Sequence, residues 1–177
     1  LPGLGLGSGP ATAANDCGAP VMGVVTCAAP VMGQSFTDAD GITYDAAGSD
    51  GLDITVLNGT TAEHVTLTST NPDAVQAIAN HGTVEQTATS TGTAVAGLYA
   101  RQQGAGAGSV TIVNDGAVTT AGDGVRGLYG DVGDAHLTLE SSGSVTVNGG
   151  NAGGLVARCT GGAIDITASG SIAINGM

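Results

Sequence analysis

Short runs of alternating apolar and polar residues recur along the chain from about residue 41 onward. The clearest runs span residues 110–113, 137–140 and 164–167, where the first and third residues are Val, Ile or Leu. A period of two is typical of β-strands that bury one face, so we expect these aliphatic side chains to point into a core. Each alternating run is followed by a turn with glycine and then by a second short run, as at 145–147 and 172–174.

These runs belong to an internal repeat in the second half of the chain. Its three units open with Gly-Leu at Gly97, Gly127 and Gly154, so the steps are 30 and 27 residues long. Each unit predicts a short Gly-Leu strand, the alternating strand and a third short strand. Three strands are the natural number for a triangular coil, and stacked coils bury together the face that one coil cannot bury alone. The sequence therefore predicts an all-β parallel solenoid, a parallel β-helix.

Glycines mark the boundaries between strands within a unit. Gly116, Gly143 and Gly170 lie between the second and third strands, and we expect each to turn a sharp corner with a positive φ. Weaker copies of the strand pattern run upstream, in segments that begin at Leu52, His64, Ala74 and Thr83.

The repeat divides the chain into two parts. Residues 41–177 amount to about five three-strand coils at the observed period. Residues 1–40 lack the repeat and hold four of the five prolines, so we expect an irregular N-terminal cap or a leader. No cap follows the last strand, which favours either a longer solenoid or an end that another copy covers.

The amino-acid composition limits the kind of hydrophobic core and the kinds of binding partner that can be expected. Glycine is abundant at 32 residues, while the chain has three Tyr, one Phe and no Trp, so a thin aliphatic core is expected. The formal net charge is −12, which argues against nucleic acid and anionic membranes as partners. The chain has no apolar run of about 18 residues, so no transmembrane helix is predicted. A small-x-small site at Ala11-Thr12-Ala13 is compatible with export.

Two of the three cysteines lie in a tandem duplication, CGAPVMGVVT followed by CAAPVMGQSF. A disulfide between Cys17 and Cys27 would stabilise the N-terminal end by about 2–3 kcal/mol in an oxidising compartment, and two free thiols are the alternative. The histidines are not clustered at metal-ligand spacing, so no metal site is expected. Alternation points Cys159 inward, as a small core residue.

Aligning the three units brings charged and aromatic residues into columns. Arg101, Asp131 and Arg158 occupy the same position and should form an outward column of charge. Tyr99 and Tyr129 align one coil apart and should lie outward beside that column. A plain structural ladder is the preferred interpretation of these columns, and together the five residues are also a possible binding patch.

Catalytic and metal-binding motifs do not appear. Asp123, Asp131 and Asp134 lie near glycine-rich turns, yet the calcium-binding nonapeptide and the EF-hand spacing are absent. The GAGAGS segment lacks the lysine of a phosphate loop, and no G-x-S-x-G elbow occurs. Glu140 and Asp165 lie on equivalent strands, where they suit a surface pair as readily as an acid pair for glycan cleavage. We therefore expect no enzyme, no metal and no cofactor.

The repeat sequences resemble a known family. GLYAR followed by SVTIVNDGAVTTAGDGV, and the later SGSVTVNGG and SGSIAING, resemble the repeats of autotransporter passenger domains (type V secretion) and related β-helical surface proteins of Gram-negative bacteria. The resemblance covers 97–177 well and 41–96 loosely. It implies a right-handed parallel β-helix that is secreted and lies outside the cell or on the outer cell surface. Such passengers include adhesins, proteases and esterases, so the family does not fix an activity.

Three functions follow from these observations, in order of preference. The first is an extracellular structural or adhesive module without catalysis, whose partners are cell-surface glycans and proteins of the host or of other cells. The second is a self-assembling filament or sheath subunit that stacks end to end on its own copies. The third is a glycan-active enzyme on a β-helix.

Overall fold

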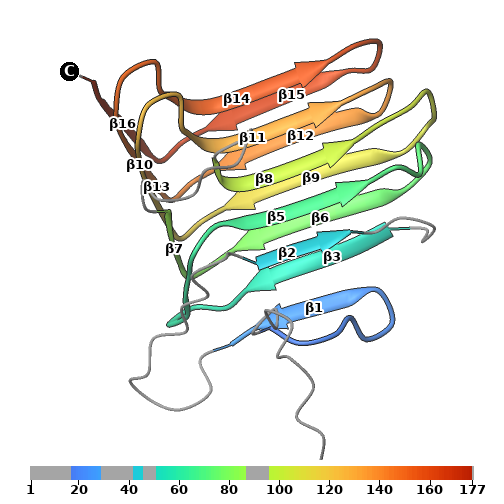
Figure 1. Cartoon of the computed structure of the whole chain (residues 1–177), viewed down its shortest axis with the longest axis horizontal. Coiled ribbons are helices and arrows are strands. Elements are labelled where there is room, and N and C mark those ends of the chain that lie inside the picture. The colour runs from blue at the N-terminus through green and yellow to red at the C-terminus, as the bar shows by residue number, and fades with distance from the viewer. Residues whose placement is uncertain (1–16, 29–41, 46–50, 87–95, 177) are drawn as a thin grey trace, which may run out of the picture.

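A computed structural model describes residues 17–28, 42–45, 51–86 and 96–176, and every regular element in these segments is a β-strand. The strands form three parallel sheets (Figure 1). The first sheet contains β1 (Val24–Cys27), β3 (Gly51–Val56), β6 (Val75–Asn80), β9 (Ser109–Asn114), β12 (His136–Ser141) and β15 (Ile164–Ala168). The second contains β2 (Ile42–Asp45), β5 (Val65–Ser69), β8 (Ala96–Gln102), β11 (Arg126–Val132) and β14 (Gly153–Cys159). The third contains β4 (Thr61–Ala62), β7 (Thr83–Gln86), β10 (Ala117–Ala121), β13 (Ser144–Asn148) and β16 (Ser171–Asn175).

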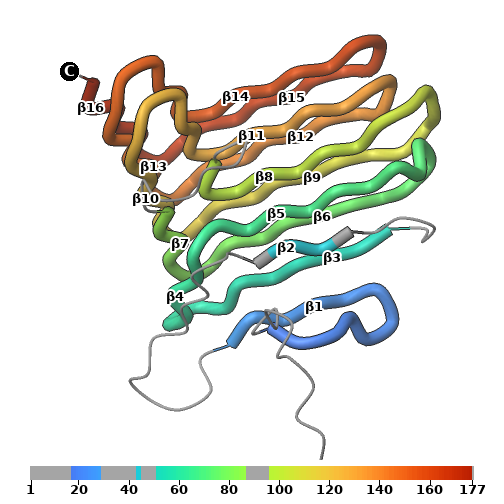
Figure 2. Tube along the Cα trace, viewed as in Figure 1, coloured from blue at the N-terminus to red at the C-terminus, as the bar shows by residue number. Residues whose placement is uncertain are grey.

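The chain visits the sheets in a fixed order, which makes each turn a coil of three strands. It passes from the second sheet to the first and then to the third, from β2, β3 and β4 up to β14, β15 and β16. Successive coils lie one above another along the tube (Figure 2). The predicted parallel solenoid of about five coils is confirmed, and the weaker upstream copies form strands as expected.

Part of the N-terminal segment also belongs to the first sheet. β1 lies within residues 1–40, yet it pairs in parallel with β3, with Val25 opposite Ile54. Residues 1–16 and 29–40 of the expected cap or leader lie outside the described residues. The structure thus places one strand of the stack before the expected boundary at residue 41.

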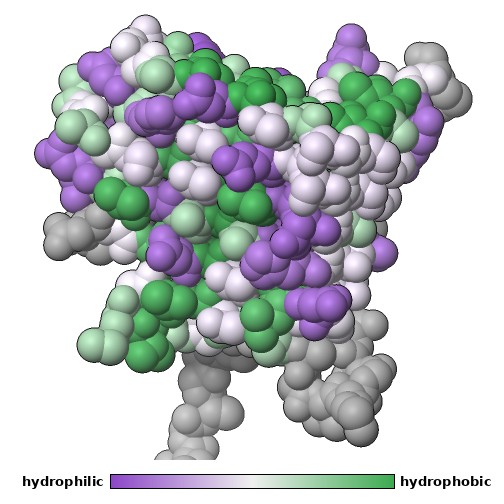
Figure 3. Space-filling view, turned by 180° about the vertical axis from the view of Figure 1, so that it is seen from behind, coloured by the Kyte–Doolittle hydropathy of each residue, from purple (hydrophilic) through white to green (hydrophobic). Residues whose placement is uncertain are grey.

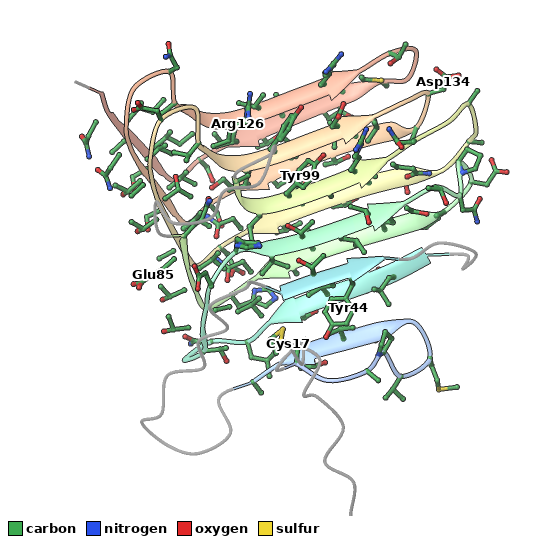
Figure 4. All side chains as sticks on the ribbon, viewed as in Figure 1. Cys17, Tyr44, Glu85, Tyr99, Arg126 and Asp134 are labelled. Carbon is green, nitrogen blue, oxygen red and sulfur yellow. A yellow bond between two sulfur atoms is a disulfide. The ribbon has the colours of Figure 1, made fainter. Side chains whose placement is uncertain are left out.

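The predicted disulfide closes this N-terminal end. Cys17 and Cys27 are bonded with an S–S distance of 2.07 Å, and Cys27 is fully buried. The Tyr44 hydroxyl donates a hydrogen bond of 2.6 Å to the carbonyl oxygen of Gly18, which holds the same loop against the second sheet. Cys17 and Tyr44 lie near each other at this end of the stack (Figure 4).

Removing the disulfide is expected to lower the free energy of unfolding by about 2–3 kcal/mol, because the unfolded chain regains the entropy of the open loop. The variant is Cys17→Ala with Cys27→Ala, measured by urea unfolding followed by circular dichroism. Reductant should destabilise the wild-type chain by a similar amount and leave the double variant unchanged. An equal effect of reductant on both proteins would contradict the prediction.

Inward side chains form continuous columns from coil to coil. In the first sheet Ile54, Ile78, Ile112 and Leu139 occupy one column and are at most 1% exposed. The same column ends at Ile166, which is 51% exposed because no strand lies beyond β15 in the described residues. Figure 3 shows hydrophobic patches between polar residues at the upper edge of the molecule, where this last coil lies.

The corner glycines differ from expectation in their conformation. Positive φ values occur at other glycines, such as Gly122 and Gly149, and not at Gly116, Gly143 or Gly170. The expectation of positive φ at these corners is wrong. They need glycine because a Cβ atom at any of them would overlap the backbone carbonyl oxygen of the glycine in the coil below.

A polar column runs beside these corners. The Asn80 side-chain amide donates to Oδ1 of Asn114 at 2.8 Å, and the Asn114 amide donates to Oγ of Ser141 at 3.2 Å. All three residues are at most 2% exposed. The column therefore links three coils through buried hydrogen bonds that satisfy its own polar groups.

Candidate functional site

The candidate site lies on the outer face of the second sheet, across β8, β11 and β14. Alternation along these strands turns Leu98 and Leu128 into the core. The residues that alternate with these leucines along each strand face outward. The parallel register brings equivalent positions of neighbouring strands side by side. Tyr99 lies opposite Tyr129, and Asp131 lies opposite both Arg101 and Arg158. The structure thus brings together all five residues of the predicted patch.

The two tyrosines stack on each other. Their ring centroids are 5.1 Å apart and the ring planes differ by 21°. The guanidinium of Arg126 lies 4.6 Å from the centroid of the Tyr129 ring, a cation–π contact. Figure 4 shows Tyr99 and Arg126 on the same side of the stack.

The rings are nevertheless largely covered by their neighbours. Tyr99 is 7% exposed and Tyr129 is 8% exposed, because they form a second apolar cluster with Ala96 and Val156. Burial raises the pKa of Tyr99, although the nearby Arg101 opposes this shift. The tyrosines therefore act as a structural ladder and offer little area to a ligand.

The charged column remains accessible. Asp131 lies between two guanidinium groups, with Oδ2 3.9 Å from Nε of Arg101 and Oδ1 3.9 Å from Nε of Arg158. The side chain of Asp131 is 23% exposed, against 43% for Arg101 and 75% for Arg158. Exposed ion pairs of this kind contribute only about 0.2–1 kcal/mol each to folding. The column therefore adds little to the stability of the fold.

A shallow depression of about 260 Å³ lies over this column. It is open to solvent, and polar side chains line most of it. Its lining includes Arg101, Gln103, Asp131, Arg158 and Thr160. Side chains from three successive coils thus converge on one hollow at the end of the second sheet.

Two histidine–aspartate pairs join adjacent coils elsewhere on the surface, and the sequence reasoning missed both. Nδ1 of His81 lies 2.7 Å from Oδ1 of Asp115, and Nε2 of His136 lies 2.8 Å from Oδ2 of Asp165. His81 and Asp115 each precede a corner glycine directly, so aligning the corners NHG and NDG would have placed them side by side. The His136 contact is diagonal, because Asp165 lies opposite Thr138, and unit alignment does not reveal it.

The remaining candidate residues do not gather into a second site. Asp165 contacts His136, and Glu140 lies opposite Thr167 and not opposite Asp165. Asp123 accepts a hydrogen bond of 3.0 Å from the amide of Gly150. In the described part of the chain no three His, Cys, Asp or Glu residues are placed to hold a metal ion.

Cys159 is half-buried and packs against the core from the last coil. Its sulfur accepts a hydrogen bond of 2.9 Å from the amide of Gly162 and donates one of 3.2 Å to the carbonyl of Gly133. It behaves as a small interior residue at the edge of the stack.

Comparison of the chain with known protein families, with curated proteins and with solved structures finds no match. The likeness to autotransporter passengers therefore rests on the repeat sequences quoted above. Within the described residues, no helix is long and apolar enough to cross a membrane.

Proposed function

We propose that this chain is an extracellular structural or adhesive module of a Gram-negative surface protein, without catalytic activity. The observation that carries the proposal is a disulfide-closed N-terminal end joined to a regular stack of parallel coils. Structural disulfides persist mainly in oxidising compartments, which supports export. Coils that hydrogen-bond to both neighbours make a stiff scaffold, suited to holding a binding surface away from the cell.

Two pairs of outward polar groups have a structural role. The pairs His81–Asp115 and His136–Asp165 each bridge two adjacent coils. The residues that sequence reasoning offered for glycan cleavage, Glu140 and Asp165, belong to different columns of the first sheet. The surface proposed for adhesion is the charged column over the depression of the second sheet.

The adhesive role is tested with beads that carry the purified chain. Attachment to epithelial cells and to immobilised cell-surface glycans is counted, and beads carrying the reduced and urea-denatured chain are the control. The proposal expects attachment that requires the folded chain. Equal attachment of both bead types would overturn adhesion. Release of sugars from a polysaccharide panel, lost in Glu140→Gln or Asp165→Asn, would support the enzyme instead.

A second candidate function is end-to-end assembly, and the open last coil favours it. Four inward isoleucines of this coil are 41–51% exposed, namely Ile164, Ile166, Ile172 and Ile174. The outer edges of β14, β15 and β16 have no partner strand within the described residues. Any further coil would cover both the apolar face and the free edges, and in this second proposal a second copy supplies it, in a head-to-tail contact that does not close. Electron microscopy and sedimentation at rising concentration test this, and a strictly monomeric chain would contradict it.

A further inference from the structure

The positive charge of this acidic chain is concentrated on one sheet. The chain has three Arg and no Lys against fifteen Asp and Glu. The three arginines, Arg101, Arg126 and Arg158, lie on β8, β11 and β14, which are neighbours in the second sheet. With Asp131 as the one acid on them, these three strands carry a surplus of positive charge in a molecule of net charge −12, and Asp134 lies in the turn after β11.

Two of these arginines are poised for a further acceptor. Arg126 packs on Tyr129, whereas Arg101 and Arg158 line the depression from either side of Asp131. Each reaches that carboxylate through Nε at 3.9 Å, well beyond the roughly 2.7–2.9 Å of a strong charge-assisted hydrogen bond. A guanidinium has five N–H donors. Arg101 also donates to the side-chain oxygen of Gln103, so Arg158 is the guanidinium that keeps most of its donors for a ligand.

The surroundings of the two guanidiniums select the kind of ligand. A volume of about 260 Å³ is below the roughly 300–1,000 Å³ of sites for drug-sized molecules, so the depression suits one ring. The Asp131 carboxylate accepts hydrogen bonds and the Thr160 hydroxyl donates and accepts them, which matches the hydroxyl groups of a sugar. The net charge of −12 disfavours a polyanion but tolerates a single carboxylate beside two cations.

We propose that this depression binds an acidic sugar, with its carboxylate on the guanidinium of Arg158 or Arg101 and its hydroxyls on Asp131 and Thr160. The proposal rests on the adhesive role above and names the ligand class of that same surface. Arg158 is the more exposed of the two arginines and is the first to meet an approaching glycan. Affinity for one sugar ring is expected to be weak, on the order of millimolar.

The ligand test compares two sugars that differ at one group. Methyl glucuronoside carries a carboxylate where methyl glucoside carries a hydroxymethyl group. Titration into the isotope-labelled full chain, followed by NMR, should shift the amide signals of 101–104, 131–133 and 158–160 saturably with the glucuronoside alone. Equal shifts with both sugars would overturn the carboxylate contact. Equal binding of succinate would assign the site to simple carboxylates and overturn the sugar.

Matched variants separate recognition from stability. Arg158→Gln should weaken glucuronoside binding roughly 10- to 100-fold, because it removes a charged hydrogen-bond partner. Arg126→Gln changes the net charge equally but lies outside the depression, so affinity should stay within about threefold. Equal losses in the two arginine variants would contradict the site.

Circular dichroism checks that each variant folds. If the Arg158→Gln variant does not fold, Arg101→Gln is used in its place. The bead assay keeps the two proposals apart. If the folded chain attaches to cells and Arg158→Gln attaches equally well, adhesion stands and the sugar site fails. If the wild-type chain does not attach but binds the glucuronoside selectively, the site stands and the adhesive role fails.

Discussion

Replacing Ile112 by alanine is expected to lower the free energy of unfolding by about 3–4 kcal/mol, while the same replacement at Ile166 should lower it by only about 1 kcal/mol. Both isoleucines belong to one inward column of the first sheet, with Leu139 between them. Ile112 is fully buried, so its loss leaves a cavity between neighbouring coils. Ile166 is already 51% exposed, so less of its surface returns to water on unfolding.

The two isoleucines are matched in residue type, strand position and column. The difference between their losses in unfolding free energy therefore measures how far the last coil is covered. Urea unfolding at low protein concentration gives both values. If Ile166→Ala costs as much as Ile112→Ala, the face of the last coil is covered in solution, and the end-to-end assembly is supported. A cost for Ile166→Ala that rises with protein concentration would identify a second copy as the cover.

Much of the fold follows from the sequence because the same physical demand recurs in every coil. A column such as Ile78, Ile112 and Leu139 requires an aliphatic residue at one position of each unit, and this makes period and register readable. The strands of residues 97–176 were predictable on this ground. β1 was not, because its register depends on contacts with β3 and its own segment carries no copy of the coil repeat.

Register imposed by neighbouring coils can also override a residue's own preference. Gln76 is buried at 1% exposure, while the adjacent Val75 is 59% exposed. Within the described residues neither polar atom of the Gln76 side chain has a hydrogen-bond partner. The strand is held by Ile78, which lies in the column of Ile112, and Gln76 is turned inward as a consequence.

The candidate site was predictable in position and less so in accessibility. The alignment of the units placed Arg101, Asp131 and Arg158 in one column, and the register confirms it. Alternation predicts on which side of a sheet a residue lies, but not which residues pack against it there. The tyrosines therefore point outward as predicted and are still covered, since they form their own cluster with Ala96 and Val156.

Replacing Gly143 by alanine is expected to lower the free energy of unfolding by about 3 kcal/mol, because the added Cβ overlaps the backbone carbonyl of Gly116 in the coil below. Backbone atoms cannot rotate away as a flexible side chain can. Relief requires the two coils to separate, which would strain the hydrogen bond of 2.9 Å from the Ser144 amide to the same Gly116 carbonyl.

Two control substitutions distinguish close approach from backbone strain. Gly124→Ala places its Cβ in open space at a φ of +72°, so its cost should be that of the left-handed conformation alone, about 1–2 kcal/mol. Gly170→Ala meets the carbonyl of Gly143 in the same way as Gly143→Ala meets Gly116, but its coil is the last described one and can shift outward. We expect its cost to lie between the other two in urea unfolding. A cost for Gly143→Ala no larger than for Gly124→Ala would mean that coil-to-coil contact does not explain the glycine column.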